Sequence, residues 1–303
     1  MRVLITGATG LIGQEIVKLC HEEGIAVNYL TTSKSKLQTQ DNYKGFYWNP
    51  QKGEIDKDCF KGVNSIINLV GASISKRWTD AYKKEVLESR TKTAALLKKT
   101  INKNNFPVKQ VVSASAIGFY PSSLTNYYEE DFETVSDTFL GEVVEQWETA
   151  VDAFTTSGIN VCKLRIGLVL SQKGGALPEI IKPMKIGAGA AFGSGEQWQS
   201  WIHIEDLARL FVYAAKQDLT GIYNAVAPNP VTNSELTKTA ATVLSRSLIL
   251  PNIPKFAMKL VLGEMHIILF ESQRVSSQKI EQEGFDFKYH HLKPALQDLL
   301  ALN

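Results

Sequence analysis

The chain has 303 residues, of which 44% are hydrophobic, so it is long enough to bury a large core in one domain or in two lobes. A formal net charge of +2 gives no overall field that would attract nucleic acid or an anionic membrane. No apolar run is long enough to span a bilayer, and no basic stripe is present. We therefore expect neither a nucleic-acid partner nor a membrane.

The cysteines and histidines predict neither disulfides nor a metal site. Cys20, Cys59 and Cys162 are odd in number, stand in apolar contexts and lack the paired spacing of metal ligands. The five histidines form no metal signature either. The first residues are typical of a core strand and not of a secretory signal. We expect no metal, and a reducing, cytoplasmic setting.

The N-terminal segment carries the most informative motif. A short apolar strand at 3–5 runs into Gly7, Gly10 and Gly13, and a helix with apolar periodicity follows near 11–22. Gly7 permits a tight turn, Gly10 lets the backbone approach a pyrophosphate, and Gly13 lets the helix pack on the strand. The free amides and the dipole of the helix start favour phosphate. The segment predicts a dinucleotide site; the alternative is a glycine turn between two core elements. The expected contacts are Gly7, Thr9, Gly10, Leu11, Ile12 and Gly13.

The second strand, expected at 26–31, bears on the choice of cofactor. In NAD-binding folds an acid about twenty residues past the glycines binds the adenosine ribose. The corresponding stretch here, 30–36, has hydroxyl groups and two lysines but no acid. A carboxylate would repel a 2′-phosphate, whereas hydroxyl and ammonium groups can bind one. We predict NADP, with NAD less favoured, and Thr31, Thr32 and Lys34 as contacts. The alternative is that the lysines only solvate a loop.

Strands and helices alternate along most of the chain. Further strands are expected at 65–69, 110–114, 161–166 and 221–226, and helices near 78–103, 139–157 and 204–217. Short strands rich in Val and Ile between helices are typical of a parallel sheet covered on both faces. The sequence predicts an α/β fold with a doubly wound Rossmann sheet over 1–170, to which 200–227 returns. A smaller C-terminal lobe is expected over 171–303.

One arginine is expected to point inward from the helix near 78–103. Val86, Arg90, Thr93 and Leu97 lie at helical spacing on one stripe, so Arg90 points where the apolar side chains point. A buried arginine needs an anionic partner or several acceptors. The candidates are the cofactor diphosphate, a substrate acid and Glu85, which could instead accept from a ribose hydroxyl. The alternative is a side chain that lies along the helix with its charged end in solvent.

Several short motifs together resemble one family. They are the glycines at 7, 10 and 13 and the segments 68–72, 89–93, 113–120, 165–170 and 200–206. With these motifs the chain resembles the extended short-chain dehydrogenases/reductases over nearly its whole length. More narrowly, it is similar to the YfcH-type NAD-dependent epimerase/dehydratase family proteins, which close with a domain of unknown function. The resemblance implies a nicotinamide cofactor and a small-molecule substrate.

The resemblance also implies roles for particular positions. The residues expected beside the adenosine end of the cofactor are Leu69, Val70, Gly71 and Ala72. Ser115 matches the serine that hydrogen-bonds the reacting carbonyl or hydroxyl in the wider superfamily. Val169 follows the strand that ends beside the nicotinamide, so its backbone is an expected contact.

The chain departs from this family pattern at the catalytic pair. Competent extended members carry a Tyr-xxx-Lys pair after the serine, in which the lysine helps the phenol to exchange a proton. Leu140 and Val144 occupy these positions here, and neither side chain can move a proton. Tyr120, at the carboxyl end of a strand, is the nearest substitute acid; its alternative role is packing with a single hydrogen bond.

Two functions and two oligomeric states follow from this pattern. The first function is an NADP(H)-dependent oxidoreductase or epimerase-like enzyme of atypical mechanism with an unidentified small substrate. The alternative is a cofactor-binding regulatory or cell-division-related protein without turnover, since some relatives carry a cell-division-inhibitor label. We expect a monomer or a homodimer, because extended relatives often pair through the two long helices.

Substrate contacts are expected after a glycine-rich stretch. Six glycines fall between positions 174 and 195, which is typical of loops at the rim of a site. Gln197 and Trp198 follow, and we expect them to contact substrate because their loop would face the cleft. His203 is a further candidate for direct chemistry, although this segment is mainly structural in extended family members.

Overall fold

The computed structural model describes residues 1–300 and is built around a nine-stranded sheet. Seven parallel strands form its body: β1 (Arg2–Thr6), β2 (Ala26–Thr31), β4 (Tyr43–Asn49), β6 (Ser65–Asn68), β7 (Gln110–Ala116), β9 (Asn160–Ile166) and β13 (Gly221–Ala225). Two short strands, β3 (Thr39–Gln40) and β5 (Glu54–Ile55), pair antiparallel with β4. The order β13-β9-β7-β6-β1-β2-β4-β3 confirms the predicted doubly wound α/β fold.

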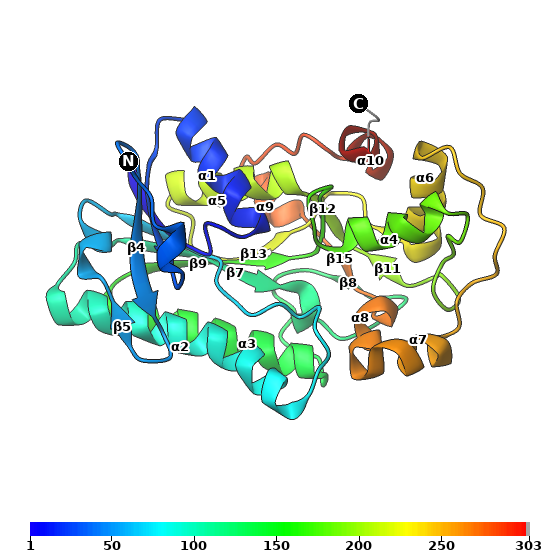
Figure 1. Ribbon diagram of the computed structural model, residues 1–303, viewed down its shortest axis with the longest axis horizontal. Helices are drawn as coiled ribbons and strands as arrows, with labels where there is room; N and C mark the ends of the chain where they lie inside the picture. Colours follow the sequence, from blue (N-terminus) through cyan, green and yellow to red (C-terminus); the bar gives the residue numbers. More distant parts are fainter. Residues whose placement is uncertain (301–303) are drawn as a thin grey trace.

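Helices cover both faces of this sheet (Figure 1). One face carries α1 (Leu11–Glu22) and α5 (Ile204–Lys216), and the other carries α2 (Asp80–Asn104) and α3 (Phe139–Asp152). Threonine hydroxyls cap α2 and α3 at their first turns, which fixes where each helix leaves its loop. The helix predicted near 139–157 ends at Asp152 and continues as a 3-10 turn.

β4 is the main element that the sequence prediction missed. Only Phe46 and Trp48 of its seven residues are buried, and Lys44 and Gly45 interrupt the apolar run. Gly45 packs so closely that a Cβ there would lie 2.5 Å from the ring of Tyr29. The central strands β1, β6 and β7 are buried almost throughout, and that continuous apolar character made them predictable.

A smaller lobe adjoins the β13 side of the sheet. It contains α4 (Ala176–Lys185), α6 (Asn233–Val243), α7 (Lys255–Leu262), α8 (Ile267–Phe270) and α10 (Leu292–Leu300). Its short strand pairs are β10 (Leu168–Leu170) with β12 (Trp201–His203), β11 (Trp198–Gln199) with β14 (Val231–Thr232), and β8 (Tyr127–Tyr128) with β15 (Arg274–Val275). α4, α6 and α10 bury a core of their own, separate from that of the sheet.

The C-terminal part of the chain is divided between the two cores. Ile280, Phe285 and Phe287 join the core of the main sheet, because α9 (Gln278–Gln282) packs against the edge strand β13. The predicted division, a lobe over 171–303 from which 200–227 returns to the sheet, stays a prediction. An exposed edge strand needs such a cover, and the sequence pattern did not reveal which segment supplies it. Within residues 1–300, no helix combines the length and apolar character needed to cross a membrane.

Candidate cofactor and substrate site

The three glycines after β1 form a turn that requires glycine. Gly7 has a φ of +74°, a backbone conformation that side chains disfavour. The amide of Gly10 donates to the carbonyl of Gly7 at 2.9 Å. A Cβ on Gly13 would lie 2.2 Å from the same carbonyl oxygen, so α1 presses directly on the turn. This is the geometry that the glycine spacing predicts.

The start of α1 leaves its backbone amides open to a ligand. Gly10 caps the helix without any side-chain hydrogen bond, and the first turn holds no acidic residue. The carbonyl of Thr9 accepts from Gln14 Nε2 at 3.1 Å, which holds the loop beside the helix. Leu11 and Ile12 are partly buried against the core of the smaller lobe. Open amides and an uncompensated helix dipole suit an anion such as a diphosphate.

The glycine turn lies beside the loop that follows β6. The Thr6 hydroxyl donates to Asn68 Oδ1 at 2.8 Å and accepts from the amides of Leu69 at 3.1 Å and Val70 at 3.3 Å. A Cβ on Gly7 would lie 3.3 Å from the Cβ of Leu69. β1 lies between β2 and β6, so the chain continues to one side of β1 at β2 and to the other side at β6. Doubly wound sheets bind their ligands at the carboxyl end of such a switch point.

The residues after β2 lie at the same edge of the sheet. The register pairs Thr6 with Leu30, which brings Thr31 beside the glycine turn. Thr31 is buried and its hydroxyl accepts from the amide of Ser33, whereas Thr32 and Lys34 are exposed. The Lys34 ammonium lies 5.2 Å from the centre of the Tyr47 ring. The segment presents hydroxyl groups and a cation, and no carboxylate.

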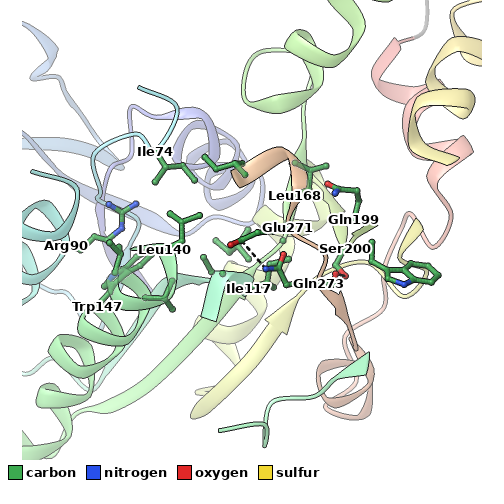
Figure 2. Close-up of a pocket in the computed structure, with 18 residues that line it drawn as sticks. Ile74, Arg90, Ile117, Leu140, Trp147, Leu168, Gln199, Ser200, Glu271 and Gln273 are labelled. Carbon is green, nitrogen blue, oxygen red and sulfur yellow. Dashed lines mark hydrogen bonds between the residues drawn. The ribbon is translucent and has the colours of Figure 1, made fainter. Parts of the chain in front are cut away.

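A pocket opens at the carboxyl ends of β7 and β9 (Figure 2). It encloses about 210 Å³, and most of its wall is apolar, including Ile117, Leu168 and four side chains of α3. Its polar members are Arg90, Gln199, Ser200, Glu271 and Gln273. This volume lies below the usual range of drug-sized sites, so the pocket suits a small group.

The positions of the missing catalytic pair face this pocket. Leu140 and Val144 both line it, together with Trp147 one turn further along α3. The family's phenol and ammonium are therefore replaced by an apolar wall.

Arg90 is buried and forms no ion pair within residues 1–300. Its side chain is 9% exposed and lies 4.9 Å from the centre of the Trp147 ring. Nη1 donates to the carbonyls of Val86 at 2.8 Å and Ala72 at 3.3 Å, and Nε has no partner within residues 1–300. Burial lowers the pKa of Arg90 to about 10. A desolvated cation that faces a pocket suits an anionic or multi-acceptor ligand.

Two further contacts place Arg90 near the loop after β6. A Cβ on Gly71 would lie 2.8 Å from the Arg90 Cζ, and the Ala72 amide donates to the Ser89 hydroxyl. Glu85, by contrast, is exposed on α2 and forms no ion pair with Arg90 among the described residues. Of the partners proposed for Arg90, Glu85 is therefore wrong, because its side chain leaves the face on which the guanidinium lies.

Ser115 is placed below the pocket and not in its wall. Its hydroxyl donates to Glu148 Oε1 at 2.6 Å, and the same carboxylate accepts from Arg165 Nε at 2.9 Å and Nη2 at 3.0 Å. Ser115 is 3% exposed, and the next residues, Ala116 and Ile117, line the pocket instead. This placement does not favour the expected contact of Ser115 with a reacting group. Its hydroxyl already donates to the Glu148 carboxylate, which is paired with Arg165.

Tyr120 is a core residue and does not line the pocket, a placement that matches the alternative role of packing with a single hydrogen bond. It is fully buried, its ring stacks on Tyr128 at 5.0 Å, and its hydroxyl donates to Asn224 Oδ1 at 2.8 Å. Burial raises the pKa of Tyr120 to about 12 although the charge of Arg165 opposes this. The strand end was predicted correctly, but the side chain points into the packing between the sheet and β8.

The three expected substrate contacts have different positions. Trp198 lines the pocket, and its Nε1 donates to the Leu124 carbonyl at 3.0 Å. Gln197 is buried, and its amide donates to the backbone carbonyls of Phe192 and Leu269. Gln197 does not line the pocket, because its side chain joins two loops.

His203 is likewise structural. Its Nδ1 accepts from the Glu205 amide at 3.1 Å and so caps α5, while its ring stacks on Tyr289 at 3.9 Å. Burial lowers the pKa of His203 despite Asp298, which lies 3.3 Å from Nε2. His203 is not among the residues that line the pocket.

Val169 lies in β10, where its side chain is partly buried against both hydrophobic cores. Its carbonyl lies 3.7 Å from where a Cβ on Gly175 would be, and its neighbours Gly167 and Leu168 line the pocket. Its backbone thus stands between the glycine loop and the pocket, as a cofactor contact there requires.

Sequence reasoning predicted Arg90 as a site residue but missed the other four polar residues of the pocket, Gln199, Ser200, Glu271 and Gln273. Glu271 and Gln273 come from the segment after α8, and Gln273 Nε2 donates to Glu271 Oε2 at 3.1 Å (Figure 2). No spacing in the sequence ties these residues to the sheet, because they reach it only through tertiary packing. Among residues 1–300, no group of His, Cys, Asp and Glu forms a candidate metal site.

Comparison with known families assigns the chain. The model of the NAD dependent epimerase/dehydratase family matches residues 3–225. The chain belongs to this family. A second model, for a domain of unknown function called DUF1731, matches residues 253–299 and so includes Glu271 and Gln273. The predicted family resemblance, with its Rossmann NAD(P)-binding fold and C-terminal domain, is confirmed.

Related family members are similar over their whole length. An Arabidopsis thaliana chloroplastic homologue of the epimerase family protein SDR39U1 is 37% identical, with 99% of this chain and 87% of that protein covered. An epimerase family protein of Staphylococcus aureus is 34% identical over 98% of both chains. The crystal structure of human epimerase family protein SDR39U1 with NADPH has a TM-score of 0.84, 29% identity and 99% coverage of both chains.

Proposed function

We propose that this family member is an NADP(H)-binding oxidoreductase or epimerase-like protein that acts on a small molecule held in the pocket. The observation that carries the proposal is a series of close approaches: Gly7 lies beside Leu69, Gly71 lies beside Arg90, and Arg90 lines the pocket. The residues fit such a cofactor, because Gly13 closes the turn and the α1 amides are open.

NADP(H) is proposed over NAD(H) on two grounds. Thr31, Thr32 and Lys34 offer hydroxyl groups and an ammonium at the end of β2, where a carboxylate would repel a 2′-phosphate. The human relative, 29% identical, has been solved with NADPH. Together these observations favour the phosphorylated cofactor.

We further propose how this chain's residues would hold it. The amides at the start of α1 would bind the diphosphate, and residues 69–72 would lie along the adenosine side. Arg90 would contribute a cation where the cofactor enters the pocket, and the Val169 backbone would lie at the nicotinamide end. The bound nicotinamide would supply hydride transfer.

Replacement of Arg90 tests this assignment. We expect Arg90→Met to weaken NADPH binding by about 10-fold to 100-fold, since a hydrogen bond to a charged group is worth about 1.5–3 kcal/mol. Arg77→Met, an exposed arginine at the loop before α2, is the matched control. Isothermal titration of both variants with NADPH gives the affinities, and equal affinities would show that Arg90 has no part in cofactor binding.

The second candidate function, cofactor binding without turnover, is favoured by Leu140 and Val144. These side chains make the wall apolar where the family's catalytic pair would stand. The two functions differ in hydride transfer. Deuterated NADPH, incubated with a panel of small ketones and aldehydes, would pass deuterium to a product in the first case and to none in the second.

We also propose a reducing compartment such as the cytoplasm. Cys20, Cys59 and Cys162 are all free and buried, and burial raises the pKa of each thiol, to about 12 for Cys20 and Cys162. The oligomeric state, monomer or homodimer, remains part of the proposal and is measurable by light scattering.

A further inference from the structure

Two charged side chains line the pocket, and one of them, Glu271, is a carboxylic acid that can exchange a proton. Among the lining residues, Arg90 stays protonated and Glu271 is the sole carboxylic acid. The Ser200 hydroxyl is already engaged, since it donates to the Gln273 carbonyl and accepts from the Val275 amide. Ser115 and Tyr120 do not line the pocket. Any proton transfer to a ligand there falls to Glu271.

The Glu271 carboxyl has one engaged oxygen and one free oxygen. Oε2 accepts from Gln273 Nε2, and the same amide nitrogen also donates to the Tyr120 carbonyl at 3.3 Å. Oε1 is shielded from solvent and has no hydrogen-bond partner within residues 1–300. A ligand in the pocket would be its first partner. An unsatisfied buried carboxyl oxygen is costly unless it carries a proton or meets a donor or acceptor.

No cation compensates the Glu271 charge. Among the described residues no lysine, arginine or histidine nitrogen lies within 4.0 Å of it, and Arg90 is paired with backbone carbonyls instead. Burial raises the pKa of Glu271 and the charge of Asp137 raises it further, while the hydrogen bond from Gln273 and the nearby Thr138 side chain oppose this shift. The carboxyl is therefore poised to hold its proton longer than a solvated glutamate would.

We propose that Glu271, contributed by the domain of unknown function, is the proton donor and acceptor of the pocket and serves a small, mainly apolar carbonyl compound or its alcohol. This inference rests on the proposed function, because hydride must come from NADPH. As hydride reaches the carbonyl carbon, the O–H bond of Glu271 breaks and its proton joins the carbonyl oxygen. The products are an alcohol, NADP⁺ and the Glu271 carboxylate; the reverse reaction returns the proton to Oε1.

The apolar wall of the pocket favours the protonated form of Glu271. Leu140, Val144 and Trp147 exclude water from one side of the pocket, and Glu271 enters from the C-terminal segment. A low-dielectric wall raises the pKa of a carboxylic acid, whereas it would prevent a lysine from staying charged. The apolar side chains that replace the family's Tyr–Lys pair therefore favour a protonated Glu271. Active sites commonly tune the pKa of a carboxylic acid in this way.

Glu271→Gln tests the proposal, with Glu196→Gln as the matched control at an exposed position near the same lobe. Glutamine keeps the shape and the hydrogen bond to Gln273 but cannot give up a proton. The first readout is the infrared carbonyl stretch of protonated carboxylic acid, titrated in the wild type and both variants. The second is NADPH oxidation with a panel of small ketones and aldehydes, measured from acidic to basic pH.

The wild type should keep an infrared band of protonated carboxyl above the usual glutamate range, and Glu271→Gln should lack it. Turnover should fall about 100-fold or more in Glu271→Gln, and in the wild type it should fall as pH rises through the carboxyl pKa. NADPH affinity should stay unchanged in both variants. An unshifted carboxyl, or turnover and pH profile that Glu271→Gln leaves intact, would overturn the proposal.

The outcomes separate this inference from the proposed function. If the wild type binds no NADPH, the proposed function fails, yet the infrared titration still decides whether Glu271 keeps its proton. If NADPH binds and no panel member is reduced, the titration alone decides, and an ordinary glutamate pKa rejects Glu271 as the proton donor.

Discussion

Gly13 lies so close to Gly7 that any side chain at position 13 would collide with the backbone. A Cβ there would stand 2.2 Å from the Gly7 carbonyl oxygen and 2.6 Å from the Cα of Ala8. Because both partners are backbone atoms of a tight turn, neither can move without opening the loop.

Gly13→Val should therefore disrupt the cofactor site. We expect the variant to lose NADPH binding and to unfold at a lower temperature, since overpacking typically costs about 1–3 kcal/mol. Gly174→Ala is the control, because its Cβ would meet only Leu11 at an ordinary 3.6 Å. Calorimetry with NADPH and thermal melts compare the two, and wild-type binding by Gly13→Val would contradict the assigned loop geometry.

Charge reversal at Lys34 should change cofactor selectivity. Lys34→Glu places a carboxylate at the end of β2, where it would repel a 2′-phosphate but leave NADH unaffected. We expect the NADPH affinity to fall about 10-fold, equivalent to about 1.4 kcal/mol, with little change for NADH. Lys52→Glu, at an exposed turn, controls for net charge. An equal loss for both cofactors would argue against a phosphate contact at Lys34.

Removal of the Glu148 charge should destabilise the protein. Arg165 and Ser115 both hydrogen-bond this carboxylate, and Lys163 lies 3.6 Å from Oε2. Glu148→Gln leaves Arg165 buried without its partner, which costs about 3–5 kcal/mol. Urea unfolding at neutral pH measures the loss. Asp152→Asn is the control, since its carboxylate is half-exposed where it meets Lys163.

The same carboxylate predicts a pH dependence. Burial alone would raise the pKa of Glu148, but the hydrogen bonds and charge of Arg165, with the Ser115 hydroxyl, hold it below its usual range. The unfolded chain then binds a proton more readily, so stability is present above the usual glutamate pKa and is lost as pH falls toward the folded value. Urea midpoints of the wild type should drop on acidification more steeply than those of Glu148→Gln.

Tyr120→Phe should alter stability and leave cofactor binding alone. The hydroxyl is buried and donates to Asn224 Oδ1, so its loss costs about 1 kcal/mol. Thermal melts and NADPH titration check this. If Tyr120→Phe instead abolished turnover while the fold stayed intact, Tyr120 would regain its place as an acid.

The strands and the glycine loop were predictable because their patterns are local. Continuous burial marks β1, β6 and β7 as central strands, and the spacing of Gly7, Gly10 and Gly13 fixes a turn within a few residues. β4 escaped prediction because Lys44 and Gly45 interrupt a strand whose exposed and buried residues alternate. Its place in the sheet depends on tertiary pairing with β2.

The pocket was harder to predict than the cofactor loop. The sequence placed Ser115 and Tyr120 at a strand end, but it did not determine that Ser115 meets Glu148 or that Tyr120 stacks on Tyr128. Glu271 reaches the pocket from a segment far along the chain, and no periodicity connects it to β7 or β9. Side-chain direction and long-range packing determine which residues line the pocket, and a local spacing in the sequence predicts neither.

The most direct test of the proposed NADP(H) site is calorimetric titration of the purified protein with NADPH and, separately, with NADH. We expect micromolar binding of NADPH and much weaker binding of NADH, because the loop after β2 carries hydroxyls and Lys34 in place of an acid. Absence of binding by either nucleotide would contradict the proposed cofactor site and leave the Rossmann sheet as a scaffold for another role.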